Sequence, residues 1–449
     1  MVQFTRSFAT SMAHIEPFRA LRYDPSRVVL SDVVTQPYDK ISPAMQDRYY
    51  AASPYNLVRI ILGKRNATDG SDDNPYTRAA ACFRDWKRDR VFLQDPEPSL
   101  YRYTQTFSAP GREIQIERRG FIALGKVEDY SANVVFRHEQ TLAKPKADRL
   151  DLLRATRAHF GQIFMLYSDP ADEIENALVS TDAPTSEVTD EYGVVHRLWR
   201  VSDPEVVGAV RSRMKDKKLI IADGHHRYET ALTYRNEHRA QAGDAPFDSA
   251  QGRSAPHDFA MMTFVNMDTP GLVILPTHRV VHGIQDFSMD AFRAGASDYF
   301  SVEEADPNVS AARAAAMVRE AGHTGTSFVV IARDRVFLLS RPKAQASPFG
   351  DLSFRQQGLD VVQLHKCLLE NVLQISEQAI RDQKNVTYVR DAREALDMVR
   401  TGQADVTFLM NPARMSQVRD IAFSGEVLPQ KSTDFYPKLL SGLTIYALE

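Results

Sequence analysis

The chain has 449 residues, 43% of them hydrophobic and 25% charged, which is typical of a folded globular protein and leaves room for two or three domains. Its formal net charge of −3 gives no electrostatic case for a nucleic-acid partner, and no apolar run approaches the ~20 residues of a membrane span. The cysteines, Cys82 and Cys367, lack a metal-binding spacing, so we expect a reducing, cytoplasmic setting.

Helical and strand patterns alternate along the chain, which predicts the mixed α/β class. In chain order, the pattern predicts a strand from Val33 that runs into a Pro-fixed turn at Pro37–Asp39, a strand over 56–62, a helix from Pro75, a hairpin over 99–125, a helix over 146–158, a strand over 162–167, a helix over 204–214, a strand over 219–222, a strand over 259–266, a helix over 361–374 and a strand over 406–410.

The texture of the sequence changes past about Gly283, where a second set of helices and strands begins. We therefore expect an N-terminal α/β domain over 15–283 and a C-terminal α/β domain over 284–449. Residues 1–14 carry no regular apolar pattern, and we expect a flexible tail there.

The stretch from Lys217 to Leu232 carries the strongest functional signal. It begins with an apolar run, Leu219–Ala222, of the kind that a buried strand uses. The chain then turns at Asp223 and Gly224. The residues after the turn are apolar at i, i+3 and i+4, which predicts the buried face of a helix.

His225, His226 and Arg227 fall in the first turn of that helix, where the positive end of the helix dipole disfavours cations. A bound anion would neutralise them, and phosphate binds readily at helix N-termini. Gly224 lets the backbone approach the anion, and Arg227 can donate to two phosphate oxygens. The simpler alternative is that Asp223 caps the helix and the histidines bond to nearby carbonyl groups.

The Asp-Gly-His-His-Arg sequence of Asp223–Arg227 resembles the signature of the free-serine kinases that use ADP or ATP, which belong to the ParB/sulfiredoxin-like superfamily. From about Ile15 to its end the chain is similar to the domain-of-unknown-function family 1015, which is placed near that superfamily. The segments that carry this similarity are Pro17–Tyr23, Gln36–Asp39, Arg137–Thr141 and Pro429–Thr433.

The resemblance implies a ParB/sulfiredoxin-like core with large insertions, followed by a C-terminal α/β unit. It also implies a kinase that moves a phosphoryl group from ADP or ATP, with Mg²⁺, to the hydroxyl of a small molecule. Free serine is the leading acceptor by this resemblance. Asp223, Gly224, His225, His226 and Arg227 would then hold the nucleotide.

A His-Glu pair, His138 and Glu139, precedes the predicted helix over 146–158. The free-serine kinases also carry a His-Glu pair upstream of their signature, and its glutamate is the general base for the serine hydroxyl. By resemblance, Glu139 is the candidate base and His138 its neighbour. The pair lies further upstream of Asp223 here than in the kinases, and the alternative for Glu139 is a solvated carboxylate in a turn.

The Asp223 carboxylate would repel phosphates unless a cation lies between them. Asp223 therefore either ligates Mg²⁺ or holds the ammonium group of a substrate, and the sequence leaves both open.

Weaker candidates for binding a substrate or anion are found in the C-terminal half. Lys431, Ser432 and Thr433 place a lysine and two hydroxyls in one loop, which suits an anion. His278 and Arg279 lie in an apolar strand and could line the same pocket. A solvated loop and a sheet edge are the respective structural alternatives.

Two other classes of protein remain open. His225 and Glu229 have an i, i+4 spacing, so together with His138 they could hold the metal of a hydrolase. A nucleotide-sensing protein without turnover would use the same phosphate-binding turn.

Overall fold

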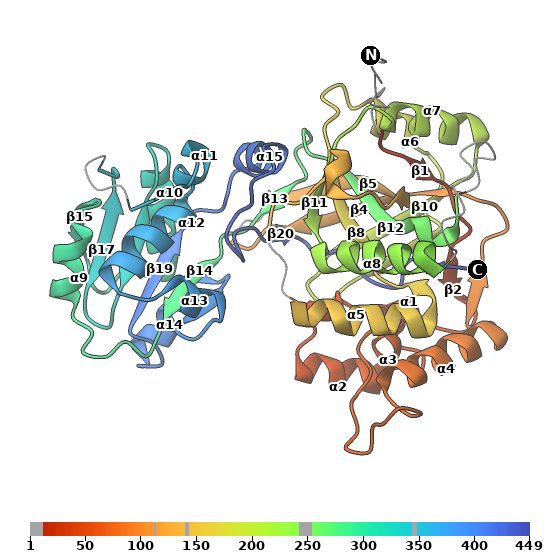
Figure 1. Cartoon of the computed structure of the whole chain (residues 1–449), viewed down its shortest axis with the longest axis horizontal. Helices are drawn as coiled ribbons and strands as arrows, with labels where there is room; N and C mark the ends of the chain where they lie inside the picture. Colours follow the sequence, from red (N-terminus) through yellow and green to blue (C-terminus); the bar gives the residue numbers. More distant parts are fainter. Residues whose placement is uncertain (1–11, 112–113, 140–142, 242–253, 344–347) are drawn as a thin grey trace, which may run out of the picture. The chain divides into compact units, whose positions relative to one another are not determined.

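The computed structural model describes residues 12–111, 114–139, 143–241, 254–343 and 348–449. They form two compact units. Unit 1 comprises Met1–Arg137, Thr141–Val273 and Pro437–Glu449, and unit 2 comprises His138–Gln140 and Ile274–Tyr436. The α/β class predicted from the sequence is confirmed: each unit contains its own sheet and helices (Figure 1).

This division differs from the one that the sequence suggested at residues 283 and 284. The last segment of the chain belongs with unit 1 because Ser441 pairs with Thr35 and Tyr446 pairs with His159. Such pairings join residues far apart in the sequence, so local patterns do not reveal them. Up to residue 11, the predicted tail lies outside the described residues.

Unit 1 is built on a mixed sheet with the strand order β6-β11-β8-β12-β5-β4-β10-β9, and β1 pairs with β5. Its strands are β1 (Ile15–Glu16), β4 (Leu100–Ser108), β5 (Gln115–Lys126), β6 (Val135–Phe136), β8 (Ile163–Tyr167), β9 (Ser186–Thr189), β10 (Val195–Val201), β11 (Leu219–Asp223) and β12 (Phe259–Asn266). Two small pairs lie apart from it: β2 (Leu21–Tyr23) with β3 (Phe92–Gln94), and β7 (Ala158–His159) with β21 (Tyr446–Ala447).

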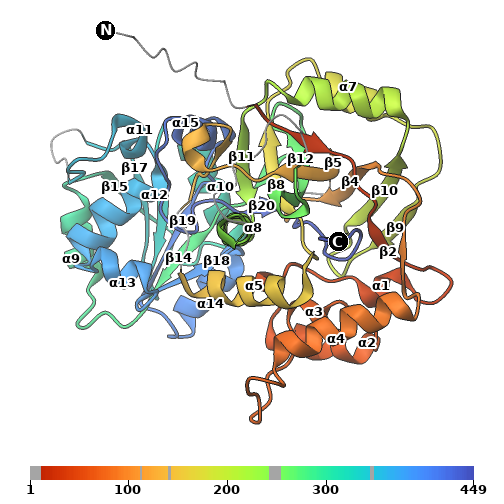
Figure 2. The ribbon, with the colours of Figure 1, turned by 45° about the vertical axis from the view of Figure 1, so that its right-hand side comes forward.

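The helices of unit 1 enclose two hydrophobic cores. They are α1 (Leu30–Val33), α2 (Pro43–Ala52), α3 (Val58–Ile61), α4 (Pro75–Arg88), α5 (Ala143–Thr156), α6 (Glu173–Leu178), α7 (Pro204–Met214) and α8 (His225–Gln241), with 3-10 turns at Tyr38–Lys40, Tyr130–Ala132 and Pro256–Asp258. One core joins α6, α7 and α8 to the sheet, and the other lies among α3, α4 and α5. Figures 1 and 2 show α5 between α8 and the α2–α4 helices.

Several helix starts follow directly from the sequence. The Asn74 side chain accepts two backbone N–H bonds ahead of Pro75 and caps α4. Asp203 caps α7 in the same way ahead of Pro204, so the predicted helix over 204–214 is confirmed.

The strand predicted over 56–62 is wrong, and the strand predicted from Val33 is reduced to one bridge between Thr35 and Ser441. Residues 58–61 form helix α3, whose first turn is supported by the Asn56 side chain, which accepts the Val58 N–H at 2.9 Å. Val33 ends helix α1, whereas the turn predicted at Pro37–Asp39 is present as a 3-10 turn that begins at Tyr38. A short apolar run fits a buried strand or a buried helix equally well. The run at 56–62 packs into the core as a helix.

Unit 2 contains an antiparallel sheet with the order β15-β17-β16-β19-β14-β18. Helices α10 and α14 pack on one face of it. Its elements are β14 (His278–Val281), α9 (Met289–Ala296), β15 (Ser301–Ala305), α10 (Ala311–Gly322), β16 (Phe328–Ile331), β17 (Val336–Ser340), α11 (Phe354–Gln357), α12 (Asp360–Gln363), a π-helix (Leu364–Val372), α13 (Glu377–Arg381), β18 (Val386–Val389), α14 (Ala392–Arg400), β19 (Val406–Met410), α15 (Met415–Phe423) and the short β20 (Phe435–Tyr436). The short β13 (Val273–Ile274), which pairs with β20, begins at the last residue of a unit 1 segment. In the described part of the chain, none of the helices has the length and apolar character that crossing a membrane requires.

Candidate functional site

The predicted strand, turn and helix around Asp223 are confirmed. Strand β11 is buried from Leu219 to Ala222 and pairs with β6 and β8. Its register against β8 shifts between Ile221 and Asp223, which frees the end of the strand to turn. Gly224 follows with a φ of +91°, and α8 begins at His225.

Gly224 makes room for the Arg227 side chain. A Cβ atom at position 224 would lie 2.9 Å from Arg227 Nε and 3.0 Å from its Cζ. A Cβ at Gly161 would lie 3.3 Å from Arg227 Nη1, so the two glycines flank one guanidinium group. Arg227 Nη1 also donates a hydrogen bond to the carbonyl oxygen of Gln162. The guanidinium is therefore fixed directly beside the backbone at the start of α8.

The Asp223 carboxylate is engaged by cations of the chain itself. Its Oδ1 accepts the Gly224 N–H at 2.8 Å, and its Oδ2 lies 3.3 Å from Lys438 Nζ and 4.0 Å from Arg227 Nη2. Burial alone would raise the pKa of Asp223, but the charges of Lys438, Arg227 and Lys40 hold it well below its usual range. The carboxylate stays ionised, and the cation that the sequence argument required beside it is the Lys438 ammonium.

The surroundings of Asp223 do not fit Mg²⁺. A divalent ion would have to displace Lys438 and approach Arg227, both of which repel it. Within the described ranges of the chain, no three His, Cys, Asp or Glu side chains are placed to hold a metal ion. Glu229, a candidate metal ligand of the hydrolase alternative, instead lies 3.9 Å from Arg137 Nη1 and 3.7 Å from Lys146 Nζ.

The other basic residues of the turn occupy the expected positions. His225 is buried, with 8% of its surface exposed, and His226 is half-buried. Both lie in the first turn of α8, so the structure brings the whole predicted nucleotide motif together at one helix N-terminus.

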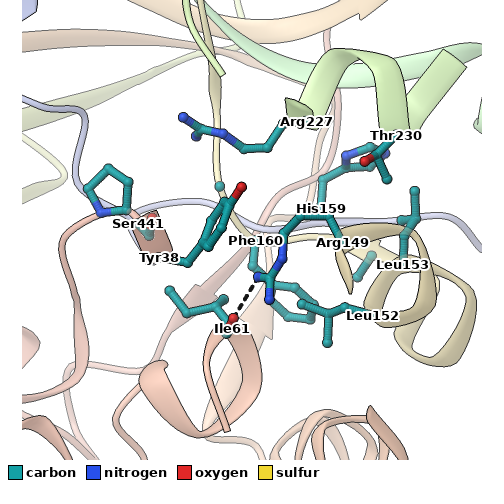
Figure 3. A pocket seen from close by; sticks show the side chains of 13 residues that line it. Tyr38, Ile61, Arg149, Leu152, Leu153, His159, Phe160, Arg227, Thr230 and Ser441 are labelled. Atoms are coloured by element: carbon teal, nitrogen blue, oxygen red, sulfur yellow. Dashed lines mark hydrogen bonds between the residues drawn. The ribbon is translucent and has the colours of Figure 1, made fainter. Parts of the chain in front are cut away.

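A pocket of about 70 Å³ in unit 1 opens beside Arg227 (Figure 3). Tyr38, Arg149, Gly161, Thr230 and Ser441 contribute to its polar lining. Tyr38 belongs to the similarity segment Gln36–Asp39, but none of these residues was predicted from the sequence as a site residue, and Lys438 was not predicted either. Of these residues, Thr230 could have been found from the sequence, because it lies three residues after Arg227 on the same helix face.

The His-Glu pair lies in unit 2, where it meets the loop that follows α15. Leu428 N–H donates to the His138 carbonyl at 2.8 Å, and His138 Nε2 lies 2.8 Å from Thr433 Oγ1. The backbone N–H of Lys431 donates to Glu139 Oε1. The structure thus brings Glu139, the predicted general base, next to the predicted anion-binding loop at Lys431–Thr433. The roles of both stay predictions.

Arg279 joins this cluster, whereas His278 does not. Arg279 is 1% exposed, and its Nη2 donates to the Lys431 carbonyl at 3.2 Å. Burial lowers the pKa of Arg279 to about 10, which leaves it charged. His278 Nδ1 accepts the Met410 N–H, and burial lowers its pKa to about 4. His278 is therefore neutral and is bonded within the sheet, and its role as a binding residue stays a prediction. Ser432 is buried, and its hydroxyl donates to the Pro429 carbonyl.

A family model described as "Protein of unknown function (DUF1015)" matches residues 15–362, and the chain belongs to this family. No curated protein matches the sequence.

Solved structures that match include a free serine kinase in complex with AMP, at 12% identity and a TM-score of 0.34, covering 69% of this chain and 89% of that one. A variant of free serine kinase in complex with ADP matches at 11% identity and a TM-score of 0.34, with the same coverage. A conserved hypothetical protein from Pyrococcus furiosus matches at 12% identity and a TM-score of 0.35, covering 70% and 92%. Similarities at this level carry no argument about activity.

Proposed function

We propose that the chain binds a nucleoside di- or triphosphate at the turn between β11 and α8 and transfers a phosphoryl group to the hydroxyl of a small molecule. ADP or ATP is the proposed donor, and free serine is the leading acceptor because of the motif resemblance. The nucleotide part of the proposal concerns Asp223–Arg227 in unit 1. The general-base part concerns Glu139 and His138 in unit 2 and rests on the motif resemblance.

One observation carries the nucleotide part of the proposal. Gly224 has a positive φ at the start of a long helix, and the Arg227 guanidinium lies only 2.9 to 3.0 Å from the place of a Cβ at position 224. Backbone N–H groups, the helix dipole and a fixed guanidinium then point to the same place, as an anionic phosphate requires. This cradle fits phosphate, whereas the Asp223 surroundings do not fit a metal.

The chemistry needed from the protein is mainly positioning and neutralisation of charge. Arg227 and the first N–H groups of α8 would hold phosphate oxygens, and His225 and His226 would add donors. Lys438 keeps Asp223 from repelling the phosphates because it offsets the carboxylate charge at 3.3 Å. Glu139 is the proposed acceptor of the proton from the substrate hydroxyl.

The test of nucleotide binding is thermal unfolding with and without ADP or ATP. A ligand bound to the native state raises stability by about 2.7 kcal/mol at a hundred times its Kd. Arg227→Ala should remove most of this shift, since a charged hydrogen bond contributes about 1.5–3 kcal/mol, or roughly ten- to a hundredfold in Kd. Arg227→Lys should retain part of it.

The matched control is Arg213→Ala, which removes an exposed arginine of unit 1 that pairs with Glu173 at 3.1 Å. It should leave the nucleotide-induced shift unchanged. If millimolar ADP and ATP leave the wild-type transition unmoved, the proposal fails. Binding without transfer to any hydroxylated metabolite in a screen would instead favour the nucleotide-sensing alternative.

A further inference from the structure

The pocket beside Arg227 carries a guanidinium at each side, with Arg227 at the phosphate turn and Arg149 beside Ile61. Figure 3 shows the Tyr38 hydroxyl directed toward Arg227, whereas Leu152 and Phe160 lie at the opposite side of the pocket. Leu152 and Phe160 belong to the core among α3, α4 and α5. A ligand that fills this pocket would therefore meet the Arg227 guanidinium at one end. At the other end it would meet apolar side chains beside the Arg149 guanidinium.

One wall of the pocket is a fixed aromatic ring. The Arg149 guanidinium lies over the Tyr38 ring, with its Cζ 4.1 Å from the ring centre. Arg149 is itself held, because its Nη1 donates to the Ile61 carbonyl at 2.6 Å. The stacked guanidinium and ring are both planar and already fixed, so they lose little freedom when a flat group packs against them, which favours a planar ligand.

Thr230 places an unused hydroxyl group in the same pocket. The residue is 4% exposed, and its Oγ1 has no hydrogen-bond partner within the described part of the chain. Leaving a buried hydroxyl unbonded costs on the order of 1–3 kcal/mol. Thr230 lies nearly one helical turn after Arg227, so its hydroxyl lies further along the pocket from the phosphate turn.

We propose that this pocket holds the heterocyclic base of the nucleotide, with the Thr230 hydroxyl bonded to a polar atom at the edge of the base. The inference rests on the proposed function, because it needs the phosphates on the Gly224 turn. A base is planar and apolar on its faces, carries polar atoms at its edge, and is joined through the sugar to the phosphates. These features match the Tyr38 ring, the Thr230 hydroxyl and the position of the pocket beside the phosphate turn.

The test compares ADP with inorganic pyrophosphate by calorimetry on three full-length proteins. Wild type should bind ADP at least tenfold more tightly than pyrophosphate, because only ADP fills the pocket. Thr230→Val should weaken ADP about three- to tenfold, the usual effect of one hydrogen bond, and leave pyrophosphate unchanged. Without ligand, the unfolding temperature of Thr230→Val should not fall below that of wild type, because the removed hydroxyl has no partner in the unliganded protein.

Thr233→Val is the matched control on the same helix. The Thr233 hydroxyl donates to the Glu229 carbonyl at 2.8 Å, and Thr233 does not line the pocket, so this change should alter neither affinity. Equal binding of ADP and pyrophosphate, or an equal loss of both in Thr230→Val, would overturn the base site and leave the phosphate turn standing. If neither ligand binds wild type, the proposed function fails, and the base site fails with it.

Discussion

Asp223 shows why an acidic residue is compatible with a site for phosphate. Its single negative charge faces two cations, Lys438 at 3.3 Å and Arg227 at 4.0 Å. The Asp223 side chain is 24% exposed and that of Lys438 is 10% exposed, so solvent screens the pair only in part. The local charge therefore stays positive, and the carboxylate orients the two cations rather than repelling an anion.

Glu175 is a buried carboxyl group of α6 that the proposed function does not use. It is 1% exposed, and neither of its oxygens has a hydrogen-bond partner within the described residues. Burial raises the pKa of Glu175 to about 7, and the charges of Arg102 and Arg119 offset part of this effect. The group is thus protonated in the folded protein over a range where it ionises in the unfolded chain.

The stability of unit 1 should consequently fall as pH rises from about 4.3 to 7, since the unfolded carboxyl ionises near 4.3 and the folded one near 7. The loss attributable to Glu175 is about 3 kcal/mol. Glu175→Gln should remove this slope in urea unfolding at pH 5, 6, 7 and 8. Glu173→Gln, an exposed change on the same helix, should keep it. A slope that persists unchanged in Glu175→Gln would contradict the assignment.

At the scale of elements, the strand, turn and helix around Gly224 could be predicted because each has a local signal. Four buried apolar residues end at an Asp-Gly pair, and the helical period starts directly after it. The strand predicted over 56–62 was wrong because its signal was only apolar content. Lys438 could not be found at all, since nothing in its local sequence marks it as the partner of Asp223.

Gly224→Ala tests whether the turn must leave space for Arg227. The new Cβ would lie 2.9 Å from Arg227 Nε and would require a φ of +91° of a residue that avoids it. We expect a loss of about 1–3 kcal/mol from the backbone alone and loss of ADP binding from the displaced guanidinium.

Gly193→Ala is the matched control, because Gly193 has a φ of +76° and a Cβ there would meet nothing within 4 Å. It should show a similar cost in urea unfolding with normal ADP binding. Normal binding in Gly224→Ala would show that the position of Arg227 does not matter for the nucleotide.

At the scale of the whole molecule, each of the two units includes a short segment that the order of the chain would place in the other unit. His138–Gln140 belongs to unit 2 through the pairing of Glu139 with Leu428, and Pro437–Glu449 belongs to unit 1. The boundaries predicted at 15–283 and 284–449 missed these two segments, because only a few backbone pairings between distant residues decide to which unit each segment belongs. The residues proposed to bind the nucleotide therefore lie in unit 1, and Glu139, the proposed general base, lies in unit 2.

This separation predicts that binding and turnover respond differently to Glu139→Gln. The glutamine carbonyl can still accept the Lys431 N–H, so the loop of unit 2 should keep its structure. The ADP-induced shift in unfolding temperature should stay unchanged, whereas loss of a general base typically slows transfer about 10²–10⁴-fold. Glu139→Ala, which removes the bond to Lys431 as well, separates the structural role from the chemical one. Transfer to serine at the wild-type rate in Glu139→Gln would exclude Glu139 as the base. A lost ADP shift in that variant would instead show that nucleotide binding depends on unit 2.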